Sequence, residues 1–251
     1  MSEPAGKHKR TSSGFPWLLI AFVLPALAVL VLLGNWQVQR LEWKEGLLAT
    51  IQVRLDAAPV PAGEIARLVI DGGDIRYRPA SASGTFDHAN EQHFFATHKG
   101  ASGYYVYTPL VMDYGRMLLV NRGFVPFDLK NPAARAEGQV EGPVTVTGLA
   151  RERLGEKPSF IVPDNDVAGN IYYWKDWSAM VDQTGYGPGA VLPFFLDADD
   201  TPNPGGWPVG GVTRIDLPNN HLQYAVTWYG LALVLVVVTG LFGWRRMRSS
   251  G

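Results

Sequence analysis

Two long apolar runs, one near each end of the chain, set the main pattern of this sequence. Residues 15–33 and 224–244 contain no charged side chain. A helix of about 20 residues rises about 30 Å, which matches the hydrocarbon core of a bilayer. Both runs therefore predict transmembrane helices, with residues 34–223 forming one large domain between them.

An amphipathic stripe follows the first apolar run. Trp36, Trp43, Leu47, Ile51 and Leu55 recur at intervals of seven, four, four and four residues. This spacing places them on one face of a helix. The first helix is therefore expected to continue beyond the apolar run and to end before the prolines at 59 and 61, with a second short helix over 62–69.

The middle of the chain has the pattern of short strands. Segments rich in Tyr, Phe, Thr and Val alternate with turn residues, and an Asp-Tyr-Gly turn at 113–115 predicts a hairpin. The predicted strands are 76–86, 93–98, 104–110, 117–126, 144–151 and 190–196, with a last extended segment at 212–217. The spacing of Trp174, Trp177 and Val181 predicts a helix over 170–183. We expect an α+β protein: two transmembrane helices flanking an antiparallel, open-barrel-like β domain with a few helices.

Basic residues flank both apolar runs on their outer sides and predict the topology. They are Lys7, Lys9, Arg10, Arg245, Arg246 and Arg248. Because positive charge beside a span tends to stay cytoplasmic, segments 1–14 and 245–251 are expected inside and the domain outside. Ala26 and Ala28 have the spacing of a signal-peptide cleavage site, but the apolar run continues for five residues beyond them, which favours a retained anchor.

Composition excludes several classes of function. The chain has no cysteine, which rules out disulfides, cysteine zinc sites and covalent c-type haem attachment. Away from the two basic ends acidic residues outnumber basic ones, which argues against nucleic acid as a partner. No G-x-S-x-G, HExxH or Walker A motif is present, and the glycines at 185, 187 and 189 fit a turn.

The remaining ionisable residues do not form an evident catalytic set. Asp164, Asp166, Asp197, Asp199 and Asp200 lie beside Pro, Gly and Asn and are interpreted as turn residues. We therefore expect no enzyme. A membrane-tethered enzyme is the alternative, and it predicts a concave pocket with convergent polar groups and perturbed ionisable residues.

The histidines fall into two groups. His88, His93 and His98 are five residues apart, and an odd spacing along a strand places neighbours on opposite faces. His221 instead opens the second apolar helix and shares a face with Ala225 and Trp228. Histidine is a common axial ligand of haem iron, and a small Ala would leave room for a flat macrocycle, with Arg40 near its propionates. An interfacial histidine that simply contacts water is the alternative.

Six short motifs occur in a fixed order along the chain. They are GNWQVQR at 34–40, GTFD at 84–87, GYYVYTPL at 103–110, VNRGFVP at 120–126, PDND at 163–166 and LPNNHLQYA at 217–225. In this order, and with an apolar run on either side, they resemble the Surfeit locus protein 1 (Shy-like) family of cytochrome c oxidase assembly factors. The resemblance covers most of the chain, and the Pro-rich loop near Thr201 matches least well.

The resemblance implies a chaperone in respiratory chain biogenesis that helps haem a reach the catalytic subunit of haem-copper oxidase. It implies His221 as axial ligand of the haem iron and Trp228 as its neighbour. From their positions on the two predicted helices we expect Ala225, Trp36 and Arg40 as further contacts. Expected partners are the oxidase catalytic subunit, the haem a synthesis enzyme and membrane lipid. The expected location is a bacterial inner membrane, crossed twice, with a periplasmic domain. The alternative is a scaffold of the same family that stabilises oxidase intermediates without binding haem.

The VNRGFVP motif is expected to have a structural role. Gly123 would supply a backbone conformation that a larger residue could not adopt, and Arg122 a buried fork of hydrogen bonds.

Overall fold

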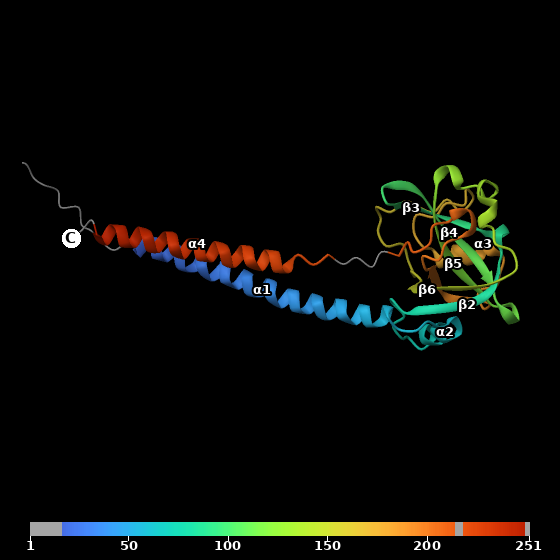
Figure 1. The fold of residues 1–251 in the computed structure, drawn as a ribbon, viewed down its shortest axis with the longest axis horizontal. Helices are drawn as coiled ribbons and strands as arrows, with labels where there is room; N and C mark the ends of the chain where they lie inside the picture. The colour runs from blue at the N-terminus through green and yellow to red at the C-terminus, as the bar shows by residue number, and fades with distance from the viewer. Residues whose placement is uncertain (1–16, 214–217, 249–251) are drawn as a thin grey trace, which may run out of the picture. The chain divides into compact units, whose positions relative to one another are not determined.

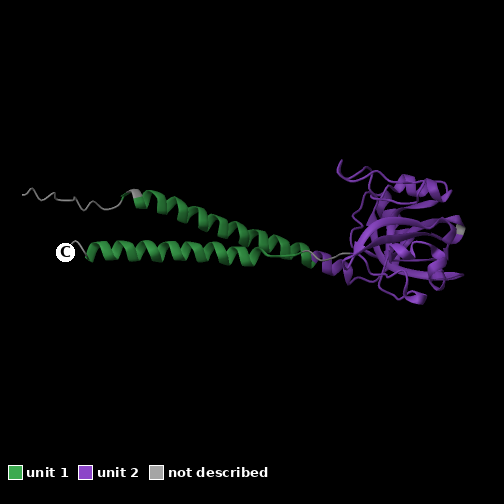
Figure 2. Ribbon diagram, turned by 90° about the horizontal axis from the view of Figure 1, so that it is seen from above, with its two compact units in different colours: residues 1–49, 216–251 green, residues 50–215 purple. Residues whose placement is uncertain are grey.

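The computed structural model describes residues 17–213 and 218–248, and the chain divides into two compact units. Unit 1 comprises residues 1–49 and 216–251, and unit 2 comprises residues 50–215 (Figure 2). The basic residues Lys7, Lys9 and Arg10 lie outside the described residues, as do positions 214–217 of the last predicted extended segment.

Unit 1 is built from two long helices, α1 (Trp17–Leu55), whose last residues belong to unit 2, and α4 (His221–Arg248). Both are long and apolar enough to cross a membrane. The predicted continuation of the first helix is confirmed, because α1 runs without interruption to Leu55 and ends before Pro59. The span limits 15–33 and 224–244 stay predictions, since both helices extend beyond them.

Unit 2 is a β-barrel with short helices (Figure 1). The strands are β1 (Val60–Pro61), β2 (Pro79–Phe86), β3 (Gln92–His98), β4 (Ala101–Val111), β5 (Met117–Pro126), β6 (Pro143–Glu152) and β7 (Val191–Ala198). Their order is β1-β2-β6-β7-β5-β4-β3, and an additional β2–β4 pairing closes five strands into a barrel. The predicted β-rich domain between two apolar helices is confirmed. The pattern did not indicate that β5 and β7 pair in parallel.

The strands of the barrel bury side chains on both of their faces, in two separate hydrophobic clusters. Leu118 and Val120 of β5 belong to a cluster that draws on all five barrel strands and on α2 (Ala62–Ile70), which contributes Ile65. Met117 and Leu119 point to the opposite face, where α3 (Trp177–Thr184) covers them. Alternate side chains thus enter two cores, which explains why β5 is apolar along most of its length.

The predicted hairpin around 113–115 is confirmed. β4 and β5 pair antiparallel from Gly103–Pro126 to Val111–Met117, with a short 3₁₀ turn at Asp113–Gly115. Gly115 has φ +69°, in the left-handed region that glycine adopts at little cost. The turn chemistry and the alternation of side chains therefore agree here.

The helix predicted over 170–183 is wrong in its first half, because α3 begins only at Trp177. The side chain of Asn165 accepts hydrogen bonds from the backbone N–H groups of Tyr173 and Trp174, at 2.8 and 3.1 Å. These N–H groups are therefore held outside a helix, and Asp176 then caps α3 by accepting from Ala179 N. The helical spacing of Trp174 is coincidental.

Candidate functional site

His221 is the first residue of α4, and its imidazole is held by α1. Nδ1 lies 2.8 Å from Oε1 of Gln37, a side chain that is only 8% exposed. Because a carboxamide oxygen accepts and cannot donate, Nδ1 carries the proton in this contact. Within the described residues Nε2 has no hydrogen-bond partner, and in the neutral tautomer with the proton on Nδ1 it carries the lone pair.

Small residues bring α1 and α4 together beside this contact. Gly34 faces the ring of Tyr229, so that an added Cβ would lie 2.7 Å from a ring carbon. Tyr229 Oη donates to Oδ1 of Asn35 at 2.7 Å, and Ala225 is 2% exposed. The order of these contacts makes the two helices antiparallel (Figure 2). Close approach over small residues is a common way for membrane helices to associate.

The side chains of the other predicted haem contacts differ in how far they are exposed. Trp228 is partly buried, whereas Trp36 is 54% exposed. Arg40 is exposed, and its guanidinium lies 3.9 Å from the ring centroid of Trp43 on the same helix. The structure thus brings His221 and Ala225 to the helix contact and leaves Trp36 and Arg40 at the surface. The roles of all five residues stay predictions.

Gln37 is the residue that sequence reasoning missed. It lies within the GNWQVQR motif, but among polar neighbours nothing marks it as different from Gln39. Its burial and its contact with a residue 184 positions away are visible only in the folded helix pair.

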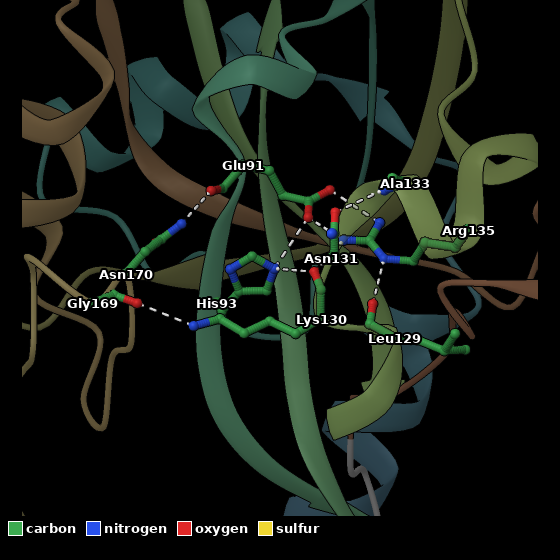
Figure 3. A network of polar contacts seen from close by, with 9 residues as sticks. All are labelled: Glu91, His93, Leu129, Lys130, Asn131, Ala133, Arg135, Gly169 and Asn170. Carbon is green, nitrogen blue, oxygen red and sulfur yellow. Dashed lines mark hydrogen bonds and ion pairs between the residues drawn. The ribbon is translucent and has the colours of Figure 1, made fainter.

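A second histidine lies in a buried ionic cluster of unit 2, shown in Figure 3. The Glu91 carboxylate accepts from the guanidinium of Arg135, and His93 Nε2 lies 3.2 Å from it and 3.1 Å from the carbonyl of Lys130. Burial alone would raise the pKa of Glu91, but hydrogen bonds from His93 and Arg135 outweigh it and lower that pKa.

The cluster fixes the loops around it. Arg135 Nε donates to the carbonyl of Leu129, Lys130 Nζ to that of Gly169, and Asn170 Nδ2 to that of Glu91 (Figure 3). This pattern is typical of structural support. Among the described residues no group of three or more His, Asp or Glu side chains is placed to hold a metal ion.

The VNRGFVP motif lies in a further buried network. Arg122 is 2% exposed, with its guanidinium 4.6 Å from the ring centroid of Phe86. Its Nη2 donates to the carbonyl of Gly138 and lies 3.3 Å from Oδ1 of Asn203. The predicted burial of this guanidinium is observed, and burial lowers its pKa to about 10. The predicted fork of hydrogen bonds is wrong, because only Nη2 donates, while Nε and Nη1 are buried without a hydrogen-bond partner among the described residues. Gly123 has φ +124°, and a Cβ there would lie 2.0 Å from the carbonyl oxygen of Val209.

Asp197 corrects the interpretation of the aspartates as turn residues. It lies in β7, is 5% exposed, and accepts hydrogen bonds from Asn121 and Thr213 at 3.0 and 2.7 Å. The proline and glycine that follow a few residues later mark the next loop, and the carboxylate itself faces inward. The turn interpretation holds for Asp199, which accepts from the backbone N–H of Thr201.

Comparison with known proteins agrees with this architecture. A sequence model of the SURF1 family matches residues 24–233. Surfeit locus protein 1 of Rattus norvegicus is 37% identical over 246 residues, covering 92% of this chain and 76% of its own length. The chain belongs to the SURF1 family. Surfeit locus protein 1 of Homo sapiens is 36% identical over 248 residues, covering 92% and 78%. A SURF1-like protein of Drosophila melanogaster is 32% identical over 247 residues, covering 91% and 77%.

The resemblance inferred from the six motifs is therefore confirmed. The matched range covers positions 37 and 221. These relatives come from eukaryotes, and the bacterial location of this SURF1-family protein stays a prediction.

Proposed function

We propose that this SURF1-family protein is an assembly factor for haem-copper cytochrome c oxidase that binds haem a and helps to insert it into the catalytic subunit. The observation that carries the proposal is the contact of His221 with Gln37. It fixes the proton on Nδ1 and leaves the lone pair of Nε2 without a partner among the described residues. A neutral imidazole with one nitrogen oriented in this way is suited to ligate haem iron.

The neighbours of His221 suit a cargo site. Because Gly34 and Ala225 are buried where α1 meets α4, the macrocycle finds its space on a flank of the pair, next to Trp228. The many exposed apolar side chains of α4, such as Leu222, Val226 and Leu233, would cover its hydrophobic tail together with lipid. A single protein ligand keeps the iron exchangeable, which a delivery protein requires.

The proposed setting is an inner membrane crossed twice. Exposed leucines and valines along α4 would be costly in water and are favourable in hydrocarbon. Arg245, Arg246 and Arg248 in the last turn of α4 would keep that end on the cytoplasmic side under the positive-inside rule. By this topology unit 2 faces the outer compartment, where it would contact the oxidase catalytic subunit and the haem a synthesis enzyme.

The decisive experiment is an absorption spectrum of the full chain, co-expressed with haem a synthesis and purified in detergent. We expect a Soret band in the parent protein and its loss or marked shift in His221→Ala. His88→Ala is the matched control, because His88 bonds the carbonyl of Val140 in unit 2 and should leave the band unchanged.

Two outcomes would contradict the proposal at different points. A Soret band unchanged in His221→Ala would exclude the ligand assignment but leave haem binding intact. A parent protein that contains no haem, yet is required for oxidase assembly, would favour the scaffold function.

A further inference from the structure

Unit 2 contains a cleft of about 400 Å³ that the proposed function does not use. It lies where the turn before β2, the end of β6 and residues 173–175 meet. Its walls carry four partly buried aromatic side chains, Tyr77, Phe94, Tyr173 and Trp174. This volume lies within the range of about 300–1,000 Å³ found for small-molecule sites.

The charges around this aromatic cleft are unbalanced. Lys175 and Arg151 line it, and their nearest carboxylate is Asp197, at 3.9 Å from Lys175 Nζ and 3.5 Å from Arg151 Nε. Both oxygens of Asp197 already accept hydrogen bonds, from Asn121 and Thr213. One carboxylate therefore serves two cations, neither of which it contacts at hydrogen-bond distance.

Lys175 has one charged partner, the carboxylate of Asp197 at 3.9 Å. Its side chain is largely buried, and within the described residues its ammonium group makes no hydrogen bond. Nζ instead lies 5.4 and 5.6 Å from the ring centroids of Tyr107 and Phe195. Burial lowers its pKa in spite of the attraction of Asp197. A buried ammonium group with three donors is stabilised by an acceptor, and a bound anion would supply one.

The other charges of the cleft are accounted for. Arg76 pairs with Asp74 at 2.9 Å and lies 3.9 Å from Glu152, whose exposed carboxylate is the negative charge among the lining residues. The excess positive charge is thus located at Lys175 and Arg151, on the side of the aromatic wall.

The wall is held in place before any ligand arrives. Asn165 of the PDND motif accepts from the backbone N–H groups of Tyr173 and Trp174 and donates to the carbonyl of Trp174. Tyr77 has φ +61°, an uncommon conformation for a bulky residue and one that recurs at binding sites. A preformed wall reduces the entropy lost on binding.

We propose that this cleft binds a carboxylate carried by an aromatic or conjugated ring, with the ring against Tyr173 and Trp174 and the carboxylate at Lys175 and Arg151. The site lies wholly within unit 2 and goes beyond the haem ligation proposed for His221. The role that we assign to it is ligand binding.

The experiment is isothermal titration calorimetry of the full chain in detergent with naphthalene-2,6-dicarboxylate. This dianion is soluble in water and too polar to enter a micelle. Cyclohexane-1,4-dicarboxylate has the same charge without the aromatic ring. We expect saturable binding of the first compound and at least about tenfold weaker binding of the second, since offset stacking and cation–π contacts are lost.

Two substitutions test the role of charge. Lys175→Gln should weaken binding about tenfold, whereas Lys99→Gln, on an exposed turn, should not change it. Glu152→Gln removes a negative charge from an exposed position and should tighten binding severalfold. A stability effect of Lys175→Gln cannot produce this tightening, so the Glu152 variant keeps the test independent of folding.

The outcomes are unambiguous. No saturable heat from the parent protein at about millimolar dicarboxylate would overturn the proposal. Equal binding of the two dicarboxylates would overturn the aromatic part of the site, and unchanged binding in both charge variants would overturn the ionic part.

A competition experiment identifies the source of the carboxylate. Displacement of the naphthalene compound by coproporphyrin, a soluble tetrapyrrole with four carboxylates, would assign the cleft to the acidic edge of a porphyrin. If the naphthalene compound binds and coproporphyrin does not displace it, the cleft is assigned to a smaller aromatic acid. His221→Ala should leave both results unchanged, so failure here is separate from failure of the haem-ligand proposal.

Discussion

Two histidines, His93 in unit 2 and His221 in unit 1, illustrate how the surroundings decide what an imidazole can do. His93 is buried, with Nε2 between the carboxylate of Glu91 and the carbonyl of Lys130. His221 is partly exposed, with Nδ1 bound to Gln37 and Nε2 without a partner among the described residues. The first ring supports neighbouring loops and has its free Nδ1 buried, whereas the second has its unpartnered Nε2 on a partly exposed side chain.

The difference depends on the type of acceptor and on access. In unit 2 a buried carboxylate requires donors, so Arg135 and His93 are both used to stabilise it. In unit 1 a neutral carboxamide orients the ring and leaves the other nitrogen unpaired. A buried ion pair is costly to break, while an orienting hydrogen bond changes affinity more than stability.

The largest effect is expected from Glu91→Gln. The change leaves the buried Arg135 without its counter-charge, which should lower the free energy of unfolding of unit 2 by about 3–5 kcal/mol. Guanidinium unfolding of the detergent-solubilised chain, followed by tryptophan fluorescence, measures it. Glu64→Gln, at an exposed position of α2, is the control. A loss below about 1 kcal/mol would show that the cluster is not a structural centre.

Arg122→Ala should have the next largest effect. The carbonyl of Gly138 and the amide of Asn203 lose their buried donor, which should cost about 1–3 kcal/mol in unfolding free energy and lower the amount of protein in membranes. The Soret band per folded molecule should not change. Arg67→Ala, on the exposed side of α2, is the matched control. Equal accumulation of Arg122→Ala and the parent protein would contradict the structural role.

Gln37→Leu should weaken haem binding without a comparable loss of stability. The imidazole loses the acceptor that fixes its proton on Nδ1, and partners of this kind typically change ligand affinity by about 10-fold to 100-fold. Titration of the purified haem-free protein with haem, followed at the Soret band, measures this. Gln39→Leu on the exposed side of α1 is the control. If both variants bind equally well, Gln37 does not orient the ligand.

The smallest effect is a pH dependence of the Glu91 cluster. The folded-state pKa of Glu91 is lowered from its ordinary value of 4.5, so its contribution to stability is present above pH 4.5 and is lost as the pH falls through the folded-state pKa. The difference in unfolding free energy between the parent protein and Glu91→Gln should therefore narrow below pH 4.5. A difference that widens on acidification would reverse the assigned sign.

Local patterns predicted much of the architecture of this SURF1-family protein. The two apolar helices and the extent of β5 follow from runs and alternations of neighbouring residues, and β5 was predicted at its observed limits, 117–126. Such features are determined by residues that lie within a few helical turns or within a single strand of one another. His221 could be singled out because its position at the start of an apolar helix is itself a local feature.

The tertiary structure alone decided where polar residues find partners. The contact of Asp197 with Asn121 and that of Gln37 with His221 join residues far apart in sequence. The hydrogen bonds that Asn165 accepts from the backbone before α3 span only eight and nine residues, but no periodicity indicates them. Barrel closure by β2 and β4 and the parallel pairing of β5 with β7 have the same origin. Hydrophobic periodicity determines which face of a segment is buried, but the partner of a polar side chain depends on which other segment is packed against it.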